Sequence, residues 1–171
     1  MFYAFLGLLV VGIVGLDQLV KWIIVDVQKI PPNTVLDEPV FWLFRIAHHQ
    51  NDGAAWSMLR GQTWFFLLVL VIFIVALVYM LKNKWFTKKA ELIALAAILG
   101  GALGNAIDRI FRDGGKVVDM IKFNFWIDFP TFNVADIFIT LGCAFLVVYV
   151  IFFDSEFGAK ADKKKEADEA P

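Results

Sequence analysis

Four long apolar stretches, separated by polar segments, set the pattern of the chain: residues 2–25, 63–81, 90–107 and 134–153. A bilayer core about 30 Å thick is crossed by roughly 20 helical residues. Each stretch has about this length, and each ends in polar residues or prolines that do not continue a lipid-facing helix cheaply. These residues are Pro31 and Pro32, Lys82 to Lys84, Asp108 and Arg109, and Asp154 and Ser155. The pattern predicts an all-α membrane protein with four transmembrane helices.

The connectors 26–62 and 108–132 are too long to be simple turns. Residues 40–46 are rich in β-forming side chains and predict a strand, and residues 51–53, Asn-Asp-Gly, predict a tight turn. Apolar residues alternate along 123–129, which predicts a strand or extended segment over 122–132. Four tryptophans belong to the same connectors or their edges: Trp42, Trp56, Trp64 and Trp126. We therefore expect a small, aromatic, β-rich platform on one face of the membrane.

Basic residues indicate the direction of the helices. The short connector 82–89 contains four lysines and no acid, and the tail adds Lys160 and residues 163–165 among acids. Basic loops stay preferentially in the cytoplasm. The sequence therefore predicts cytoplasmic N and C termini and an extracytoplasmic platform. We expect residues 1–153 to form a single integral membrane domain, and the charged tail 154–171 to be disordered.

Composition agrees with a membrane protein and excludes several other classes. The 171 residues are 60% hydrophobic, against about 45–50% in soluble domains, and mean hydropathy is +0.69. A net charge of −1 gives no indication of a nucleic-acid partner. The single cysteine, Cys143, excludes an internal disulfide framework. No basic segment precedes the apolar residues 1–16, so we do not expect a cleaved signal peptide.

Charged and amide side chains converge at one membrane depth. A charge in mid-membrane costs about 2.5–3.5 kcal/mol, so such residues face the protein interior or a wet cavity. With the predicted directions, the outer ends of the first, third and fourth helices carry seven such residues. They are Asp17, Lys21, Asn105, Asp108, Arg109, Asn133 and Asp136. Asp119 lies in the predicted loop between the last two helices. A shared site explains this convergence better than scatter does.

Purely structural roles remain open for each of these residues. Asp17 and Lys21 can neutralise each other at i,i+4, as can Asp108 and Arg112. Residues 133 and 136 have the spacing of a helix cap. Asn105, Asp108 and Arg109 can form a structural cluster of polar side chains that bond one another. Gly100, Gly101 and Gly104 can serve close helix packing. Asp119 can be a solvated loop residue. His48 and His49 point to opposite faces of a strand, so we expect no metal site.

Five segments in order carry a family resemblance: Asp17-Gln-Leu-Val-Lys21, Asn51-Asp-Gly-Ala-Ala-Trp56, Gly100-Gly-Ala-Leu-Gly-Asn-Ala-Ile-Asp-Arg109, Val117-Val-Asp119 and Phe132-Asn-Val-Ala-Asp136. Together they resemble the bacterial lipoprotein signal peptidases, also called signal peptidase II. The resemblance extends to about residue 153. Two departures are visible: the segment from Arg109 to Asp119 is about two residues longer than the family pattern, and Met120 replaces a usual aromatic residue.

The resemblance implies roles for individual residues. Asp119 and Asp136 match the two catalytic aspartates. Asn105, Asp108, Arg109 and Asn133 match positions that shape the site, and Asp17, Lys21, Asn51 and Gly53 match further positions associated with structure and activity.

The implied reaction is hydrolysis of the peptide bond before the diacylglyceryl-modified cysteine of a prolipoprotein, in the bacterial cytoplasmic (inner) membrane. The implied partners are lipidated prolipoproteins and membrane lipid, the implied inhibitor is globomycin, and we expect a monomer.

The chemistry of two neighbouring carboxyls explains how an aspartate pair can hydrolyse a peptide bond. Two neighbouring carboxyls do not easily both ionise, so they share a proton, and one serves as base while the other serves as acid. Such a pair activates water without a metal or another cofactor. Two other classes stay open: a small transporter, because intramembrane charges also form ion pathways, and a non-catalytic scaffold.

Overall fold

The computed structural model describes residues 1–40, 42–53, 58–125 and 129–153. It contains four helices long and apolar enough to cross a membrane, together with a three-stranded antiparallel sheet. The main helices are α1 (Phe2–Trp22), α2 (Thr63–Lys82), α3 (Lys89–Phe111) and α4 (Val134–Phe153). The strands are β1 (Thr34–Val40), β2 (Phe44–Asn51) and β3 (Val117–Phe123). A π-helical turn η1 (Ile23–Val27) extends α1, and a 3-10 turn η3 (Asp113–Gly115) follows α3.

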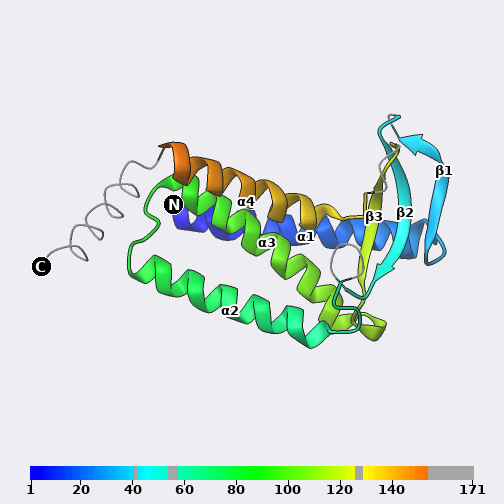
Figure 1. Cartoon of the computed structure of the whole chain (residues 1–171), viewed down its shortest axis with the longest axis horizontal. Coiled ribbons are helices and arrows are strands. Elements are labelled where there is room, and N and C mark those ends of the chain that lie inside the picture. The colour runs from blue at the N-terminus through cyan, green and yellow to red at the C-terminus, as the bar shows by residue number, and fades with distance from the viewer. Residues whose placement is uncertain (41, 54–57, 126–128, 154–171) are drawn as a thin grey trace, which may run out of the picture.

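The helices form an elongated bundle with the sheet at one end (Figure 1). α3 packs between α1 and α4, and α2 packs chiefly against α3. The sheet adjoins the end of α1, the end of α3 and the beginning of α4, and the N-terminus lies at the opposite end of the bundle. Four apolar helices and a small sheet agree with the predicted fold class. The cytoplasmic location of the termini and the extracytoplasmic location of the sheet stay predictions.

The predicted ends of the third span need correction. The sequence places its end at Ile107, but α3 continues to Phe111. Asp108 was expected to stop the helix because a charge is costly in lipid. In the structure its side chain has 0% exposure, because it faces α1 rather than lipid. The helix therefore passes through this position without exposing a charge to lipid.

Close helix contacts explain the glycines of α3. A Cβ at Gly100 would lie 3.0 Å from Cβ of Ile13, and a Cβ at Gly101 would collide with the carbonyl oxygen of Ala135. α3 thus approaches α1 on one side and α4 on the other at these positions, as the pattern of small residues predicts.

Gly101→Ala is expected to destabilise the bundle by about 1–3 kcal/mol, because the added methyl group meets backbone that has to move. Thermal unfolding in detergent micelles measures the effect. The matched control is Gly15→Ala on α1, where an added Cβ meets nothing within 4 Å, and alanine favours a helix over glycine there. Equal melting temperatures for the two variants would contradict the packing role of Gly101.

The strand predictions were wrong in their positions. Residues 40–46 do not form one strand: β1 ends at Val40, β2 begins at Phe44, and these two residues pair across a hairpin. Trp42 lies in the hairpin with φ of 56°, a conformation that the unbroken apolar run does not signal. Phe41 lies outside the described residues. Beyond the hairpin, the chain bends at Asp52 and Gly53, in agreement with the turn signal of residues 51–53.

The third strand also lies earlier than predicted. The alternation suggested residues 122–132, but β3 covers Val117–Phe123, and Phe132 returns to form an isolated bridge with Ile121. Asp119 is therefore in a strand rather than in a loop. Val117 to Met120 are all buried, so the alternative of a solvated Asp119 is wrong.

Two of the four tryptophans expected at the platform are described: Trp42, in the β1–β2 hairpin, and Trp64, at the beginning of α2, are both exposed. Trp56, Trp126, Ile127 and the tail 154–171 lie outside the described residues.

Candidate active site

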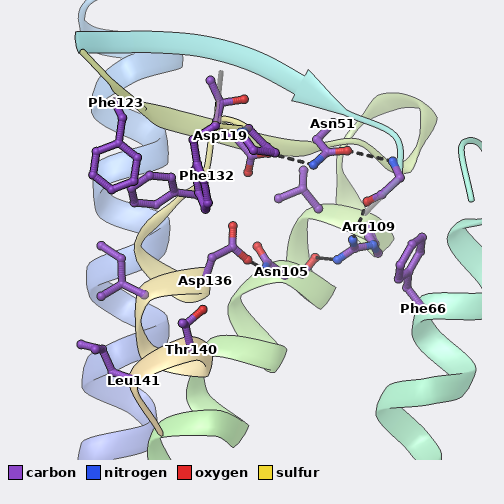
Figure 2. Close-up of a pocket in the computed structure, with 16 residues that line it drawn as sticks. Asn51, Phe66, Asn105, Arg109, Asp119, Phe123, Phe132, Asp136, Thr140 and Leu141 are labelled. Carbon is purple, nitrogen blue, oxygen red and sulfur yellow. Dashed lines mark hydrogen bonds between the residues drawn. The ribbon is translucent and has the colours of Figure 1, made fainter. Parts of the chain in front are cut away.

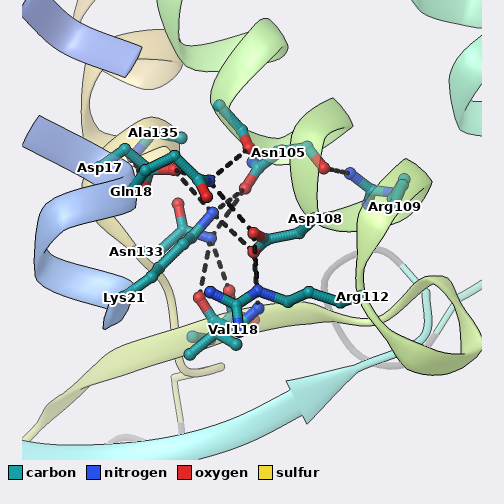
Figure 3. A network of polar contacts seen from close by, with 12 residues as sticks. Asp17, Gln18, Lys21, Asn105, Asp108, Arg109, Arg112, Val118, Asn133 and Ala135 are labelled. Carbon is teal, nitrogen blue, oxygen red and sulfur yellow. Dashed lines mark hydrogen bonds and ion pairs between the residues drawn. The ribbon is translucent and has the colours of Figure 1, made fainter. Parts of the chain in front are cut away.

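A buried ion cluster joins α1 to α3 next to β3 (Figure 3). The Lys21 ammonium lies 2.7 Å from Asp17 Oδ2 and 2.9 Å from Asp108 Oδ2. It also donates a hydrogen bond of 3.2 Å to Asn105 Oδ1. Lys21, Asp17 and Asp108 have no exposed side-chain surface. A buried charge is tolerated only when it is paired, and Lys21 thereby fixes α1 against α3.

Asp108 connects the end of α3 to the beginning of β3. Its Oδ1 accepts a hydrogen bond from Arg112 Nε at 2.9 Å, and its Oδ2 accepts the backbone N–H of Val118 at 3.1 Å. Two carboxylates in this region are thus balanced by Lys21 and Arg112. The predicted i,i+4 pairings of both aspartates are confirmed, and Asp108 also positions the strand that carries Asp119.

Asp17 connects α1 to the beginning of α4. Its Oδ1 accepts the backbone N–H of Ala135 at 3.0 Å. A Cβ at Gly104 would lie 2.8 Å from Asp17 Oδ2, so glycine at this position leaves the room that the carboxylate occupies.

Asn105 and Asn133 lie between the ion cluster and the two remaining aspartates. Asn133 Nδ2 donates to Asn105 Oδ1 at 2.9 Å and to Asp119 Oδ1 at 2.7 Å. Asn105 Nδ2 donates to Asp136 Oδ1 at 2.8 Å. The two amides therefore hold both carboxyls by direct hydrogen bonds.

Asn133 and Asp136 also cap α4. Asn133 Oδ1 accepts the backbone N–H of Asp136 at 2.9 Å, and Asp136 Oδ2 accepts the backbone N–H of Asn133 at 3.1 Å. This reciprocal arrangement matches the predicted cap. The same two side chains thus begin the helix and contribute to the polar site.

The Asp119 and Asp136 carboxyls face a common cavity of about 530 Å³ (Figure 2). Its polar lining includes Asn51, Asn105 and Arg109. Its apolar lining comes from α2, β3, α4 and the segment before α4, and includes Phe66, Phe123, Phe129, Phe132, Ile137 and Leu141. Two acids beside an apolar wall form a site that admits both a reacting polar group and a hydrophobic ligand.

Burial raises the pKa of Asp119 to about 7, and the nearby Asp136 carboxylate contributes to the increase. Hydrogen bonds from Asn51 and Asn133 act in the opposite direction and lower it. The Asn51 bond is 2.9 Å long. Asp119 is therefore poised to exchange a proton near neutral pH, as a general acid or base requires.

This pKa predicts the pH dependence of stability. The ordinary pKa of Asp119 is 3.8, so between about pH 4 and 7 the folded chain holds a proton that the unfolded chain has released. Asp119 then destabilises the fold progressively as pH rises through this range, and Asp119→Asn removes the effect. We expect the variant to melt at a higher temperature than the parent at pH 8, with a smaller difference at pH 5.

Thermal melts in detergent at both pH values measure this difference. Asp113→Asn, at an exposed carboxyl in η3, is the control and should show little change between pH 5 and 8. A gain for Asp119→Asn that is equal at both pH values would contradict the raised pKa.

Arg109 lies outside the ion cluster, so it does not join Asn105 and Asp108 in the polar cluster that the sequence suggested. Its guanidinium lies 4.3 Å from the centre of the Phe66 ring, and it donates to the carbonyl oxygens of Gly53 at 3.3 Å and Asn105 at 3.5 Å. Asp108 and Arg109 are consecutive helical residues, so one faces α1 while the other faces α2. Arg109 thus presents a cation to the cavity.

The bend after β2 orients Asn51. Asn51 Oδ1 accepts the backbone N–H of Gly53 at 2.9 Å, which leaves its Nδ2 free to donate to Asp119. A Cβ at Gly53 would collide with the carbonyl oxygen of Met58, so only glycine fits there.

The extra residues of the longer segment, within 110–115, and Met120 do not line the cavity. The longer segment forms η3, where Gly114 and Gly115 have φ of 68° and 64°. A Cβ at Gly115 would lie 2.6 Å from Thr63 Oγ1. Met120 packs in a buried cluster with Ile24, Ile30 and Val118.

The sequence analysis did not identify Gln18, a further polar residue of the ion cluster. Gln18 donates to Asp108 Oδ1 and to the Gly104 carbonyl oxygen, both at 3.1 Å. The sequence could have indicated this role, because an amide side chain next to Asp17 in an apolar span is costly to expose to lipid.

Histidines do not assemble a metal site in the part of the chain that the structure describes, where no group of three or more His, Cys, Asp or Glu residues is placed to hold a metal. His48 is buried and its Nδ1 lies 2.5 Å from the Ile30 carbonyl oxygen, while His49 is exposed.

Comparison with known proteins agrees with the motifs. The model of the family described as Signal peptidase (SPase) II matches residues 9–152. The lipoprotein signal peptidase of Listeria monocytogenes serotype 4a (strain HCC23) is 40% identical over 151 residues, which cover 86% of this chain and 93% of the relative. That of Anoxybacillus flavithermus (strain DSM 21510 / WK1) is 39% identical over 145 residues, covering 83% and 82%.

Two solved structures of bacterial membrane enzymes share the fold. One aligns with a TM-score of 0.79 at 32% identity and covers 90% of this chain and 91% of its own. The other aligns with a TM-score of 0.75 at 33% identity and covers 89% and 95%. With four apolar helices and these homologues, the chain is a multi-pass bacterial membrane protein, and it belongs to the signal peptidase II family, the lipoprotein signal peptidases.

Proposed function

We propose that the chain is an aspartic endopeptidase that removes signal peptides from prolipoproteins by cleaving before the diacylglyceryl-modified cysteine. The observation that carries the proposal is the pair of carboxyls, Asp119 and Asp136, at one cavity with an apolar wall. The lipoprotein signal peptidases to which the chain is similar support the substrate class.

In the proposed reaction, one carboxyl of the pair takes a proton from water while the other donates a proton to the leaving nitrogen. Amide hydrolysis requires both transfers, and two close carboxyls provide them because only one ionises easily. Asn105 and Asn133 hold the carboxyls at their positions. Arg109 supplies a positive charge at the cavity, where it would stabilise negative charge that develops on the substrate carbonyl oxygen.

We infer that the sheet lies on the extracytoplasmic face of the bacterial inner membrane and that both termini are cytoplasmic. The lysines of 82–89 support this direction. The cavity then opens at the outer membrane edge, where water and an apolar substrate segment meet. We further propose that residues 1–153 act as one peptidase domain and that the protein is a monomer.

The arrangement of polar residues argues against a transporter. Glu91, near the opposite end of α3, is buried and accepts the backbone N–H groups of Thr87 and Lys88, both at 3.0 Å. It therefore caps α3 rather than providing a step in a path through the membrane, which an ion pathway would need.

Cleavage of a defined substrate tests the proposal. The purified chain in detergent is expected to shorten a lipidated prolipoprotein, and mass spectrometry should place the new N-terminus at the lipidated cysteine. The same prolipoprotein with that cysteine changed to serine, which cannot be lipidated, is the control and should stay intact. Equal cleavage of both substrates, or cleavage at another bond, would contradict the proposed specificity.

A further inference from the structure

A second cavity lies between α1, α2 and α3, toward the end of the bundle opposite the sheet. Its volume is about 690 Å³, within the range of roughly 300–1,000 Å³ typical of ligand pockets. Among the described residues, none lines both this cavity and the one at Asp119 and Asp136. Its walls are mainly apolar and include Leu6, Val10, Leu77, Leu92 and Leu99.

The cavity lies where α1 and α2 pack little against each other. Gly7 of α1 lines the cavity, and a Cβ added there would meet nothing within 4 Å. α2 packs chiefly against α3 and leaves this side uncovered. Apolar walls offer water few hydrogen-bond partners. In a bilayer, an acyl chain is therefore the filling that this cavity favours.

Two lysines lie at the mouth of the same cavity. Lys82 is the last residue of α2, Lys84 follows in the connector to α3, and both are exposed lining residues. Across the described ranges, no carboxylate forms an ion pair with either lysine. Both ammonium groups are therefore available to an anionic ligand.

The end of α2 holds Lys84 in a conformation that glycine usually adopts. Its φ is 54°. Its N–H donates to the Leu81 carbonyl oxygen, and that of Trp85 donates to the Met80 carbonyl oxygen, the pattern of a left-handed helix end. This turn ends α2 and places Lys84 beside the cavity that it lines.

Two aromatic residues near Lys82 and Lys84 indicate that this end of the cavity lies at the level of the lipid headgroups. Tyr79 and Trp85 are both exposed, and their rings meet edge to face with centres 6.3 Å apart. Exposed tyrosine and tryptophan side chains favour the headgroup level of a bilayer. The lysines at this end of α2 thus lie near lipid phosphates, while the cavity extends into the hydrocarbon.

We propose that this cavity binds one anionic phospholipid, with an acyl chain between α1, α2 and α3 and the headgroup on Lys82 and Lys84. Two ammonium groups favour a lipid of net negative charge over one whose headgroup amine cancels its phosphate. The lysine-rich connector 82–89, which contains no acid, adds attraction over a longer range.

Native mass spectrometry of the full chain tests the proposal, with phosphatidylglycerol and phosphatidylcholine of the same acyl chains supplied in equal amounts. The parent is expected to retain one phosphatidylglycerol. A basic residue near anionic lipid strengthens binding about fivefold, so the double variant K82Q/K84Q should lose roughly 25-fold in phosphatidylglycerol retention at low salt. Gly7→Leu, which fills the cavity, should lower retention of both lipids.

Two variants serve as matched controls. Gly12→Leu adds the same side chain to α1 at another open glycine, which does not line the cavity. K163Q/K164Q removes two lysine charges from the tail and reports general attraction to anionic lipid. Both should retain phosphatidylglycerol like the parent.

Several results would overturn the proposal: equal retention of the two lipids by the parent, an unchanged K82Q/K84Q, an unchanged folded Gly7→Leu, or equal losses in the controls. A dimer without lipid would instead assign the cavity to a second copy of the chain. If Gly7→Leu fails to fold, as circular dichroism would show, the exposed lysine variant decides alone. Lipid retention requires no peptidase activity, so the outcome is independent of the proposed reaction.

Discussion

Asp136→Asn is expected to lower cleavage of a lipidated prolipoprotein by about 10³-fold or more. Proton transfer by a positioned group contributes about 10²–10⁴-fold to a rate, and asparagine takes up no proton at neutral pH. Its amide oxygen can still accept one of the two hydrogen bonds that Asp136 receives, from Asn105 Nδ2 or from the Asn133 N–H. The variant should therefore fold while losing the reaction, and a gel-shift assay of substrate shortening measures the loss.

Asp119→Asn should have a comparable effect, because the proposed reaction needs both carboxyls. Asp113→Asn is the matched control: it makes the same chemical change at an exposed carboxyl and should cleave like the parent. Circular dichroism and thermal melts establish that each variant is folded. Normal cleavage by a folded Asp119→Asn or Asp136→Asn would exclude the pair as the catalytic groups.

Among the proposed substitutions, Lys21→Met is expected to lower the free energy of unfolding the most. Methionine approximates the length of the lysine stem but removes the charge that lies 2.7 Å from Asp17 and 2.9 Å from Asp108. Breaking a buried ion pair by removing one partner costs about 3–5 kcal/mol, since the other partner stays buried and uncompensated. For a chain of this size, that loss corresponds to a melting temperature lower by roughly 10 °C in detergent.

Two further variants separate charge from shape at Lys21. Lys29→Met makes the same change at an exposed lysine and should melt like the parent. Adding Asp17→Asn to Lys21→Met removes the uncompensated carboxylate, because Asp108 keeps its ion pair with Arg112, and should recover part of the lost stability. A parent-like melting temperature for Lys21→Met, or no recovery in the double variant, would contradict the ionic role of Lys21.

Local patterns were sufficient to predict the helices because each span depends on its own composition. Their predicted ends lie within a few residues of those observed, except at Asp108, where a contact with Lys21 of another helix lets α3 continue. The strands were predicted less well. A hairpin through Trp42 and the pairing of β3 with β2 depend on partners distant in the sequence, and an aromatic alternation indicates a strand without locating its partner.

The sequence by itself determined the four apolar spans, the gathering of polar residues at one depth and the family motifs. The sequence also predicted an i,i+4 partner for Asp17 and for Asp108. The second ion pair of Lys21, with Asp108 on α3, and the cavity that Asp119 and Asp136 share were decided by the tertiary structure. Asp17 and Asp108 share Lys21, whereas Asp119 is buried by strand pairing and bonded by Asn51, which is 68 residues away. Burial and neighbouring charge set the pKa of a carboxyl. Both depend on contacts between distant residues, and only folding creates them.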